Sequence, residues 1–278
     1  DKSIMNTFPE IFDLKLLNIR RSRFEEKNKV NFLQNICIHN TNERLKDLNR
    51  NLEDVGILSD FFELWSLNLN LKNVQQIKYD NISNLKPSFF DFIVCSFNLH
   101  WSNDPIGHII QLKRSLKKDG LLLIFLLGGQ TLKELRYTLN NLDSEKNHKF
   151  SSRIPPMGDL KDYGNLLMRA GLSLPVADNF LLEVEYSNIM KLFEDLRKMG
   201  ETNVYLKRNK KNLHKHDIRK IEQSYKSNFS CSNDKKNIKV TFEVICLTGW
   251  VPSENQQKPL KPGSALKSLQ DVLGFEEL

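Results

Sequence analysis

The middle of the chain carries short apolar runs bounded by turn-forming residues. Such runs lie at Val74–Tyr79, Phe90–Ser96 and Leu121–Leu127. The last two are nearly continuous, which is typical of strands buried on both faces of a parallel sheet. Between them, residues 104–118 carry apolar positions at helical spacing, and Gly120 follows as a terminator. The pattern predicts a strand–helix–strand unit whose two strands are parallel neighbours or near neighbours.

Helical spacing of apolar residues predicts helices on both sides of this unit. Before it, Phe12–Lys29 is expected to form a helix, and Val30–Leu48 a helical pair around a polar hinge. After it, the expected helices are residues 130–141, 159–170 and 188–198. Lys239–Thr248 alternates and is rich in β-branched residues, which predicts a late antiparallel strand at the sheet edge. The sequence therefore predicts an α/β fold with a helical prelude.

Composition excludes several classes of protein. The 278 residues are 40% apolar with a formal net charge of +7, so a disordered or collagenous chain is excluded. The longest apolar run, Leu121–Leu127, is too short for a membrane-spanning helix. The four cysteines lie far apart without a C-x-x-C pair, which indicates neither a zinc site nor a disulfide framework and fits a reducing compartment.

The basic segment Lys207–Lys226 leaves two interpretations open. A charge run of this kind is usually the solvated face of a helix, and the alternative is a docking surface for an acidic partner. The arginine cluster that begins at Arg20 is likewise interpreted as a solvated face. Templates for hydrolytic or metal chemistry are missing, since there is no G-x-S-x-G, no H-E-x-x-H and no Cys/His pairing at ligand spacing. No metal site is predicted.

One segment carries a specific motif. Residues 90–101 have the sequence F-D-F-I-V-C-S-F-N-L-H-W, followed by Asn103-Asp104 and later by L-K-K-D-G at residues 116–120. This pattern resembles strands four and five of class I S-adenosylmethionine-dependent methyltransferases. Further segments, at residues 128–136, 169–171, 192–203 and 249–265, resemble one branch of that family, and so do residues 11–13 together with Arg20 and Arg21. The branch contains the complex I assembly factor, an arginine hydroxylase, with its alphaproteobacterial relatives, and is similar to the malonyl-carrier-protein methyltransferase of biotin synthesis.

The resemblance implies a fold and a domain arrangement. The expected fold is α/β, a Rossmann-like class I methyltransferase sheet with a helical N-terminal extension and a C-terminal helical lid. The extension would cover residues 1–48 and the methyltransferase-like domain residues 49–250, with the lid or insert in residues 128–240. Residues 251–278 would form a C-terminal tail.

The resemblance also implies a binding site for S-adenosyl-L-methionine. Asp54 and Gly56 lie where the family has its glycine-rich turn after strand one. Asp80 would bind the adenine amino group, and its alternative role is a helix or turn cap. The wall of the cofactor pocket would be completed by neighbours of Asp80 and by residues after the next strand, namely Asn81, Ile82, Ser96, Phe97 and Leu99.

Three residues are candidates for the substrate side. His100 and Trp101 would close the pocket toward the substrate, and His100 could act as a base. Trp101 could instead be an aromatic residue that packs on the following helix. Arg136 could meet an anionic substrate group. No residue is assigned as catalytic.

The chain departs from the family at the turn after strand one. Glycines there let the backbone approach the cofactor, yet Leu52–Asp60 contains only Gly56. The stretch from Gly56 to Phe90 is also about twenty residues short of a complete strand, helix and strand. Strand two is expected to be lost or stunted. Either the chain has lost cofactor binding, or the printed sequence omits a stretch near Val55 or Asn68.

The resulting hypothesis is a methyltransferase-like protein of the transferase class that modifies or assembles a protein partner such as a complex I subunit. The alternatives are a non-catalytic assembly or binding factor and a malonyl-carrier-protein O-methyltransferase. No nucleic-acid partner and no transmembrane segment are expected. The expected location is the bacterial cytoplasm or, after removal of a leader, the mitochondrial matrix.

Overall fold

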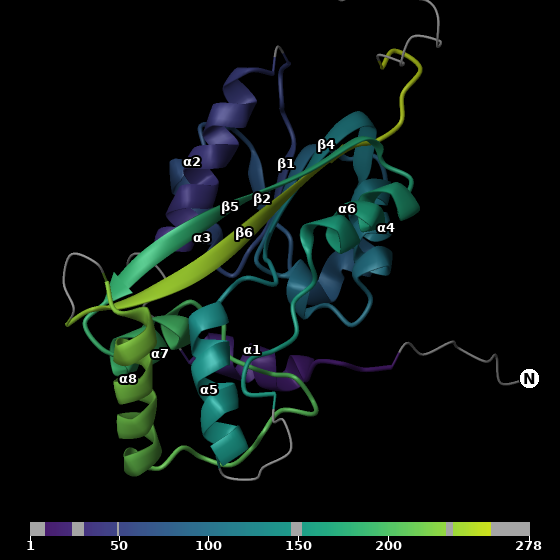
Figure 1. Cartoon of the computed structure of the whole chain (residues 1–278). Helices are drawn as coiled ribbons and strands as arrows, with labels where there is room; N and C mark the ends of the chain where they lie inside the picture. The colour runs from purple at the N-terminus through teal and green to yellow at the C-terminus, as the bar shows by residue number, and fades with distance from the viewer. Residues whose placement is uncertain (1–8, 24–30, 49, 146–151, 232–235, 257–278) are drawn as a thin grey trace, which may run out of the picture.

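A six-stranded mixed sheet forms the centre of the computed structural model (Figure 1). The structure describes residues 9–23, 31–48, 50–145, 152–231 and 236–256. The strands are β1 (Val55–Leu58), β2 (Val74–Gln76), β3 (Phe90–Ser96), β4 (Leu116–Leu127), β5 (Ser173–Tyr186) and β6 (Ile238–Trp250). Their order across the sheet is β2-β1-β3-β4-β6-β5. The predicted Rossmann-like α/β class is thereby confirmed.

One strand of the sheet, β6, runs opposite to the other five. β2, β1, β3 and β4 run parallel, while β6 is antiparallel to both β4 and β5. The chain passes from β1 to β2 on one side and then returns to place β3 on the other side of β1. The carboxyl ends of β1 and β3 therefore meet at a topological switch point, which is where open α/β sheets bind ligands. We call this region the carboxyl edge.

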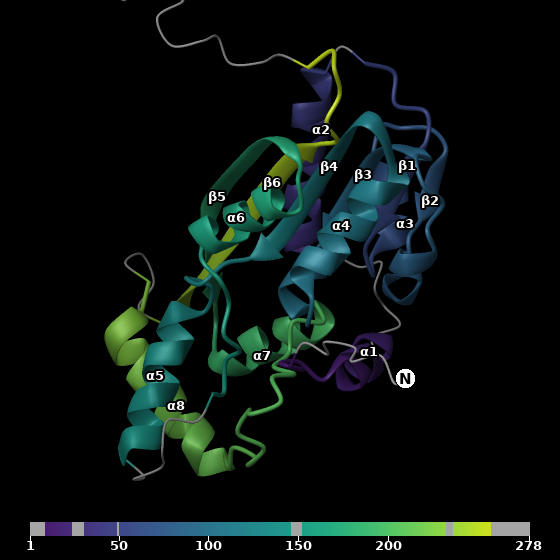
Figure 2. The same ribbon diagram turned by 90° about the vertical axis from the view of Figure 1, so that its right-hand side faces the viewer.

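Helices cover both faces of the sheet (Figure 2). They are α1 (Leu14–Ser22), α2 (Phe32–Lys46), α3 (Phe62–Asn68), α4 (Pro105–Ser115), α5 (Lys133–Glu145), α6 (Leu160–Arg169), α7 (Ile189–Lys198) and α8 (Lys215–Phe229), with the short 3-10 segments η1 (Tyr79–Asn84) and η2 (Leu99–Trp101). Within the described ranges, no helix combines the length and the apolar character needed to cross a bilayer.

The two faces of the sheet are buried by different helices because strand side chains alternate. Phe92 and Val94 of β3 share a core with α2 and α3, including Leu33 and Trp65. Ile93 and Cys95 share a second core with residues of α4 and α6. All of these side chains are buried, so β3 has the continuous apolar sequence of a central parallel strand.

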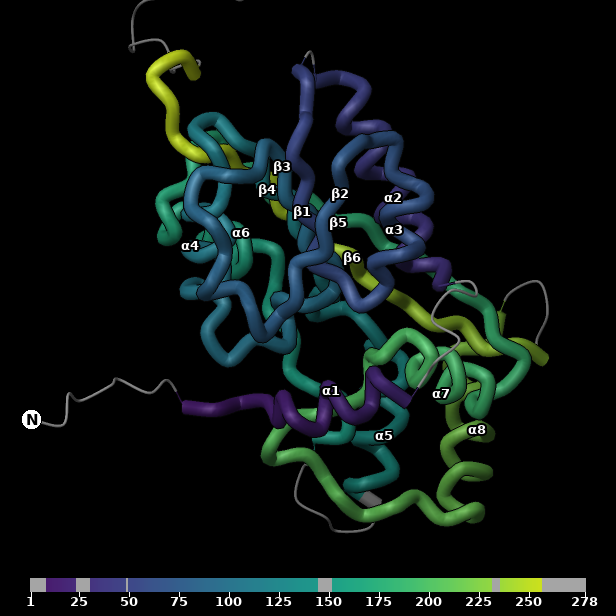
Figure 3. The backbone as a smooth tube through the Cα atoms, turned by 180° about the vertical axis from the view of Figure 1, so that it is seen from behind, coloured from purple at the N-terminus to yellow at the C-terminus, as the bar shows by residue number. Residues whose placement is uncertain are grey.

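β5 and β6 extend past the other strands as a two-stranded arm (Figure 1). β6 pairs with β4 only over Val244–Trp250, whereas it pairs with β5 from Ile238 onward. α5, α7 and α8 gather around this arm, with α5 against α8 and β6, and α7 against α8 and β5. α1 lies beside α7 (Figure 3). The arm thus carries a helical layer away from the parallel strands.

Most of the helices and strands predicted from the sequence are present in the structure. The strand–helix–strand unit is confirmed, and β3 pairs with β4 in parallel as expected. The polar hinge expected in residues 30–48 is wrong, because Phe32–Lys46 forms one helix. The late strand is antiparallel but does not lie at the sheet edge, since β5 takes that position. No strand had been predicted for β5, because Pro175 and the Asp178-Asn179 pair interrupt its pattern, and an edge strand tolerates such residues.

The region between β1 and β3 is shorter than a full pair of strand–helix units. It holds α3, the three-residue β2 and η1. β2 is the strand expected at Val74–Tyr79, and it pairs directly with β1. The described residues provide no additional strand between β1 and β2, in line with the predicted loss of strand two.

Gly56 is a packing residue of β1, and this leads to a stability prediction. A Cβ atom at Gly56 would lie 2.6 Å from Ile77 Cδ1 and 3.2 Å from Ile93 Cγ1. We expect Gly56→Val to destabilise the fold by about 1–3 kcal/mol through overpacking, measured by denaturant unfolding. Gly129→Ala is the control, because its nearest contacts would be 3.6 Å away. Equal stability of Gly56→Val and the unsubstituted chain would contradict this packing.

Candidate functional site

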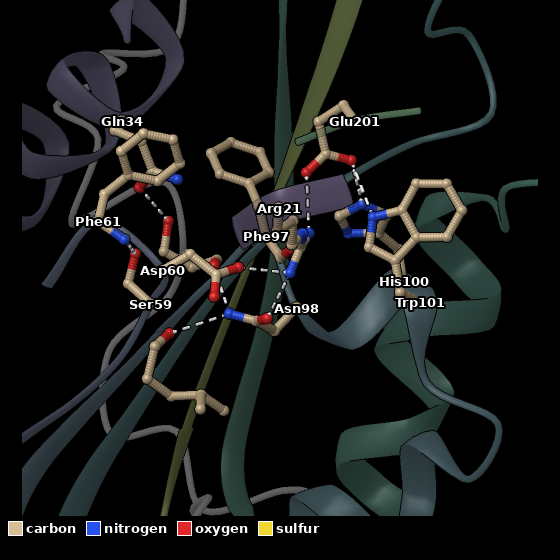
Figure 4. A network of polar contacts seen from close by, with 12 residues as sticks. Arg21, Gln34, Ser59, Asp60, Phe61, Phe97, Asn98, His100, Trp101 and Glu201 are labelled. Atoms are coloured by element: carbon tan, nitrogen blue, oxygen red, sulfur yellow. Dashed lines mark hydrogen bonds and ion pairs between the residues drawn. The ribbon is translucent and has the colours of Figure 1, made fainter. Parts of the chain in front are cut away.

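The carboxyl edge brings together segments that are distant in sequence (Figure 4). Ser59–Phe61 follows β1, and Phe97–Trp101 follows β3. Arg21 comes from α1, and Glu201 follows α7. These segments form a network of buried polar contacts at the switch point of the sheet.

Arg21 is the centre of this network, with an exposed fraction of only 7%. Its Nη1 donates to Asp60 Oδ2 at 2.6 Å and to Asn98 Oδ1 at 2.8 Å. Its Nη2 donates to the Phe97 carbonyl at 2.9 Å and to Glu201 Oε1 at 3.2 Å. One guanidinium therefore ties the turns after β1 and β3 to the segment after α7.

Glu201 accepts hydrogen bonds from two further side chains. Its Oε2 lies 2.8 Å from His100 Nε2 and accepts from Trp101 Nε1 at 2.9 Å. Burial alone would raise the pKa of Glu201, but His100, Arg21 and Trp101 together hold that pKa below its ordinary value. Glu201 is thus a buried carboxylate that stays ionised among its donors.

A turn at Gly200, at the end of α7, places Glu201 beside Arg21 and His100. Gly200 has a φ of +75° and directly follows the C-cap Met199 of α7. The Gly200 N–H donates to Arg197 O, and the Glu201 N–H donates to Leu196 O. This is the Schellman arrangement, which favours glycine because a Cβ is strained at positive φ. A Cβ there would also lie 2.9 Å from Arg21 Cγ.

The turn after β3 is held by its own side chains. Phe97 adopts a φ of +52°, which is unusual for a residue other than glycine. The Asn98 amide donates to Ser96 O at 2.9 Å and to Leu58 O at 3.4 Å, so it joins the ends of β1 and β3. Strained residues that are held by surrounding structure concentrate at functional sites, which agrees with the position of this turn at the switch point.

The predicted cofactor residues divide between two edges of the sheet. Asp54 precedes β1 at the amino edge, where it pairs with Lys117 at 2.9 Å. Gly56 lies inside β1, so the connection from β1 to α3 is the glycine-free segment Ser59–Phe61. The structure does not bring Asp54 or Gly56 to the carboxyl edge.

The other predicted residues lie at or after the carboxyl ends of β2 and β3. Asp80 and Asn81 are exposed in η1, while Ile82 is buried in the core beside α4. Ser96, Phe97 and Leu99 are buried. The Ser96 hydroxyl donates to Gln34 Oε1 at 2.6 Å, so it is tied to α2.

The substrate-side candidates are separated. His100 and Trp101 are neighbours in η2 and share Glu201. Trp101 is also buried against Phe12, with ring centroids 5.3 Å apart. Arg136 lies on α5 and donates to the carbonyls of Gly129 and Thr131, so it closes the turn between β4 and α5.

Sequence reasoning did not identify four members of the network, which are Arg21, Asp60, Asn98 and Glu201. Arg21 had been assigned to a solvated cluster, whereas the structure buries it. The available signal was that residues 192–203 and the segment around Arg20 both matched the same branch of the family. Their meeting across 180 residues of sequence was not predicted.

Three buried polar atoms near the carboxyl edge have no hydrogen-bond partner. They are Arg21 Nε, His100 Nδ1 and the Tyr79 hydroxyl. Buried polar atoms are usually paired, so these atoms are suited to meet a polar ligand. A cofactor with a carboxylate, hydroxyls and an amine fits this donor and acceptor set. The described residues contain no group of three His, Cys, Asp or Glu side chains suited to a metal ion.

The network predicts a specific pH dependence of stability. Because the pKa of Glu201 is lowered on folding, its contribution is present above the ordinary value of 4.5 and is lost as the pH falls through the folded pKa. We expect Glu201→Gln to cost about 1.5–3 kcal/mol at neutral pH and progressively less on acidification below 4.5. Denaturant unfolding across the pH series tests this.

Glu10→Gln is the control for this series, because Glu10 is exposed. It is expected to follow the unsubstituted chain at every pH. A constant difference between Glu201→Gln and the unsubstituted chain down to acid pH would contradict an ionised Glu201.

Comparison with known proteins gives one family match and several curated relatives. The family described as "Methyltransferase domain" matches residues 43–124. "Arginine-hydroxylase NDUFAF5, mitochondrial" of Dictyostelium discoideum is 35% identical over 195 residues, which cover 70% of this chain and 44% of the relative. The human protein of the same name is 31% identical over 230 residues, covering 80% of this chain and 65% of the relative.

A bacterial relative is named for a different activity. The malonyl-acyl-carrier-protein O-methyltransferase of Laribacter hongkongensis is 27% identical over 185 residues, covering 66% of this chain and 57% of the relative. The chain thus spans less than two thirds of each of these three relatives. The match of residues 43–124 and the sheet topology show a methyltransferase domain with a Rossmann-like class I methyltransferase fold, to which these relatives are similar.

Proposed function

We propose that the chain binds S-adenosyl-L-methionine at the carboxyl edge and modifies or assembles a protein partner, in the manner of the complex I assembly branch. The observation that carries this proposal is the switch point between β1 and β3, where Arg21 and His100 retain buried polar atoms without partners. Ligands of open α/β sheets bind at this position. The bound cofactor would supply an electrophilic methyl group.

Different residues of the carboxyl edge would bind different parts of the cofactor. The Arg21 guanidinium would hold the cofactor carboxylate through Nε, its nitrogen without a partner in the described residues. Asp80, just past the end of β2, would accept from the adenine amino group, and Asp60, after β1, from the ribose hydroxyls. Phe97 and Leu99 would supply apolar contacts. We leave Asp54 and Gly56 out of this site, because Asp54 lies at the amino edge and Gly56 lies inside β1.

His100 and Glu201 would act on the substrate side of the cofactor. The carboxylate of Glu201 orients the imidazole through Nε2, which leaves Nδ1 as a buried atom without a partner. A histidine oriented by a carboxylate can hold a proton or release it. Trp101, fixed by the same carboxylate, would keep water from this side.

The curated relatives support the kind of partner and its location. The Dictyostelium and human proteins are named mitochondrial arginine-hydroxylases, which supports a protein substrate and the mitochondrial matrix rather than the bacterial cytoplasm. The malonyl-carrier-protein relative has lower identity, at 27%. A complex I subunit is therefore the proposed partner.

Cofactor binding is tested by titrating the full chain with S-adenosyl-L-methionine in a calorimeter. We expect one-to-one binding that Asp80→Asn weakens by about 10–100-fold, because a hydrogen bond to a charged group contributes about 1.5–3 kcal/mol. Asp54→Asn is the matched control at the amino edge and is expected to keep the full affinity. Absence of binding in the unsubstituted chain would overturn the proposal, and loss in Asp54→Asn alone would move the site to the other edge.

The protein partner is tested by incubating the chain with purified complex I subunits and the cofactor. We expect mass spectrometry to show a one-methyl mass increase on a subunit, or a stable complex with one. If the chain modifies no subunit and associates with none, the proposed partner is contradicted. The proposed cofactor binding is tested separately and would still stand.

A further inference from the structure

A second feature of the molecule is a cavity between the helical layer and the segment that follows α7. Its volume is about 830 Å³, within the range of ligand sites. The apolar wall comes from α5, from the residue just before it and from α7. Its residues are Leu132, Leu135, Leu139, Met190, Phe193 and Leu196. The carboxyl-edge residues Asp60, Asp80 and Asn98 do not line it.

The rim of this cavity is strongly cationic. Six basic side chains line it, namely Arg20, Arg153, Arg197, Arg208, Lys210 and Lys211. The acidic residue among the lining side chains is Glu201, which is already engaged by Arg21 and His100. Charge at the rim is therefore poorly balanced by the chain itself.

Most of these cations have no ion pair in the described part of the chain. Arg153 lies 3.4 Å from Asp143. Arg20 donates to the Thr202 hydroxyl and the Asn203 carbonyl, and Arg208 to the Tyr205 carbonyl, all of which are neutral acceptors. Burial, Arg208 and Arg23 lower the pKa of Arg20, as expected where like charges gather. A smaller cavity of about 330 Å³, lined by Arg20, Arg23, Arg197 and Thr202, extends the positive surface.

The basic run at Lys207–Lys226 divides between two environments. α8 begins at Lys215, so its basic residues lie on a helix, as expected for a solvated face. Arg208, Lys210 and Lys211 instead precede this helix and line the cavity. This part of the run agrees better with the alternative interpretation, a surface for an acidic partner.

We propose that this cavity receives an acidic segment of the protein partner that also carries apolar side chains. The inference rests on the proposed function in taking the partner to be a protein. The five lining cations other than Arg153 exceed what a ligand with a single carboxylate can neutralise, whereas a peptide with several Asp or Glu side chains complements them. Its apolar side chains would pack against the wall formed by α5 and α7.

Glu201 connects this cavity to the carboxyl edge. It lines the cavity and at the same time pairs with Arg21 and His100. A segment bound in the cavity would therefore lie beside the residues proposed to work on the substrate side of the cofactor. The two sites share Glu201, whereas the carboxyl-edge residues Asp60, Asp80 and Asn98 do not line the cavity.

The test uses two fluorescent synthetic peptides of equal length and the full chain. One alternates Asp or Glu with Leu or Phe, and the other replaces every acid by Asn or Gln. We expect the acidic peptide to bind at least about tenfold more tightly by fluorescence anisotropy. The double variant Arg197→Gln/Arg208→Gln should weaken acidic-peptide binding by about tenfold or more, and Met190→Gln should weaken binding of both peptides.

The matched control also removes two positive charges, but at positions that do not line the cavity. Arg114→Gln/Arg169→Gln changes two exposed arginines on α4 and α6, and should leave peptide affinity within about twofold. Equal binding of the two peptides, or an equal loss in the control pair, would overturn the proposal. Decanoate that binds as tightly as the acidic peptide and displaces it would identify a small-anion site instead. Titration of each variant with S-adenosyl-L-methionine separates failure of this inference from failure of the proposed function.

Discussion

The buried guanidinium of Arg21 is the interaction on which the carboxyl edge depends. It joins the turn after β1, the turn after β3 and the segment after α7 through four hydrogen bonds. A buried cation is costly unless it is paired, and here Asp60 and Glu201 provide the compensating charge. The helix α1 is consequently fixed across the end of the sheet, where it closes one side of the proposed cofactor site.

Glu201 extends the same constraint toward the helical layer. Because it also binds His100 and Trp101, the segment after α7 cannot move without breaking contacts to η2. The arm formed by β5 and β6 carries α7 to this position, although it projects away from the parallel strands (Figure 2). The fold thereby places an apolar cavity with a cationic rim next to a polar ligand edge, and one carboxylate belongs to both.

Local sequence pattern predicted the parallel part of the fold well. The continuous apolar run at Phe90–Ser96 gave β3 with the observed bounds, because a strand buried on both faces leaves this signature. β5 was missed because half of its side chains face solvent and an edge strand tolerates polar interruptions. The motif at residues 90–101 indicated His100 and Trp101. Arg21 and Glu201 could not be paired from pattern alone, since burial of a charge depends on partners 180 residues away.

A crystal structure with S-adenosylhomocysteine tests the central claim most directly. The account predicts ligand density at the carboxyl edge, between Ser59–Phe61 and Phe97–Leu99, with the ligand carboxylate on Arg21. The contacts of Arg21 with Asp60 and Glu201 would then be partly exchanged for contacts with the ligand. Density at the amino edge beside Asp54, or an edge still closed by Arg21 at saturating ligand, would contradict it.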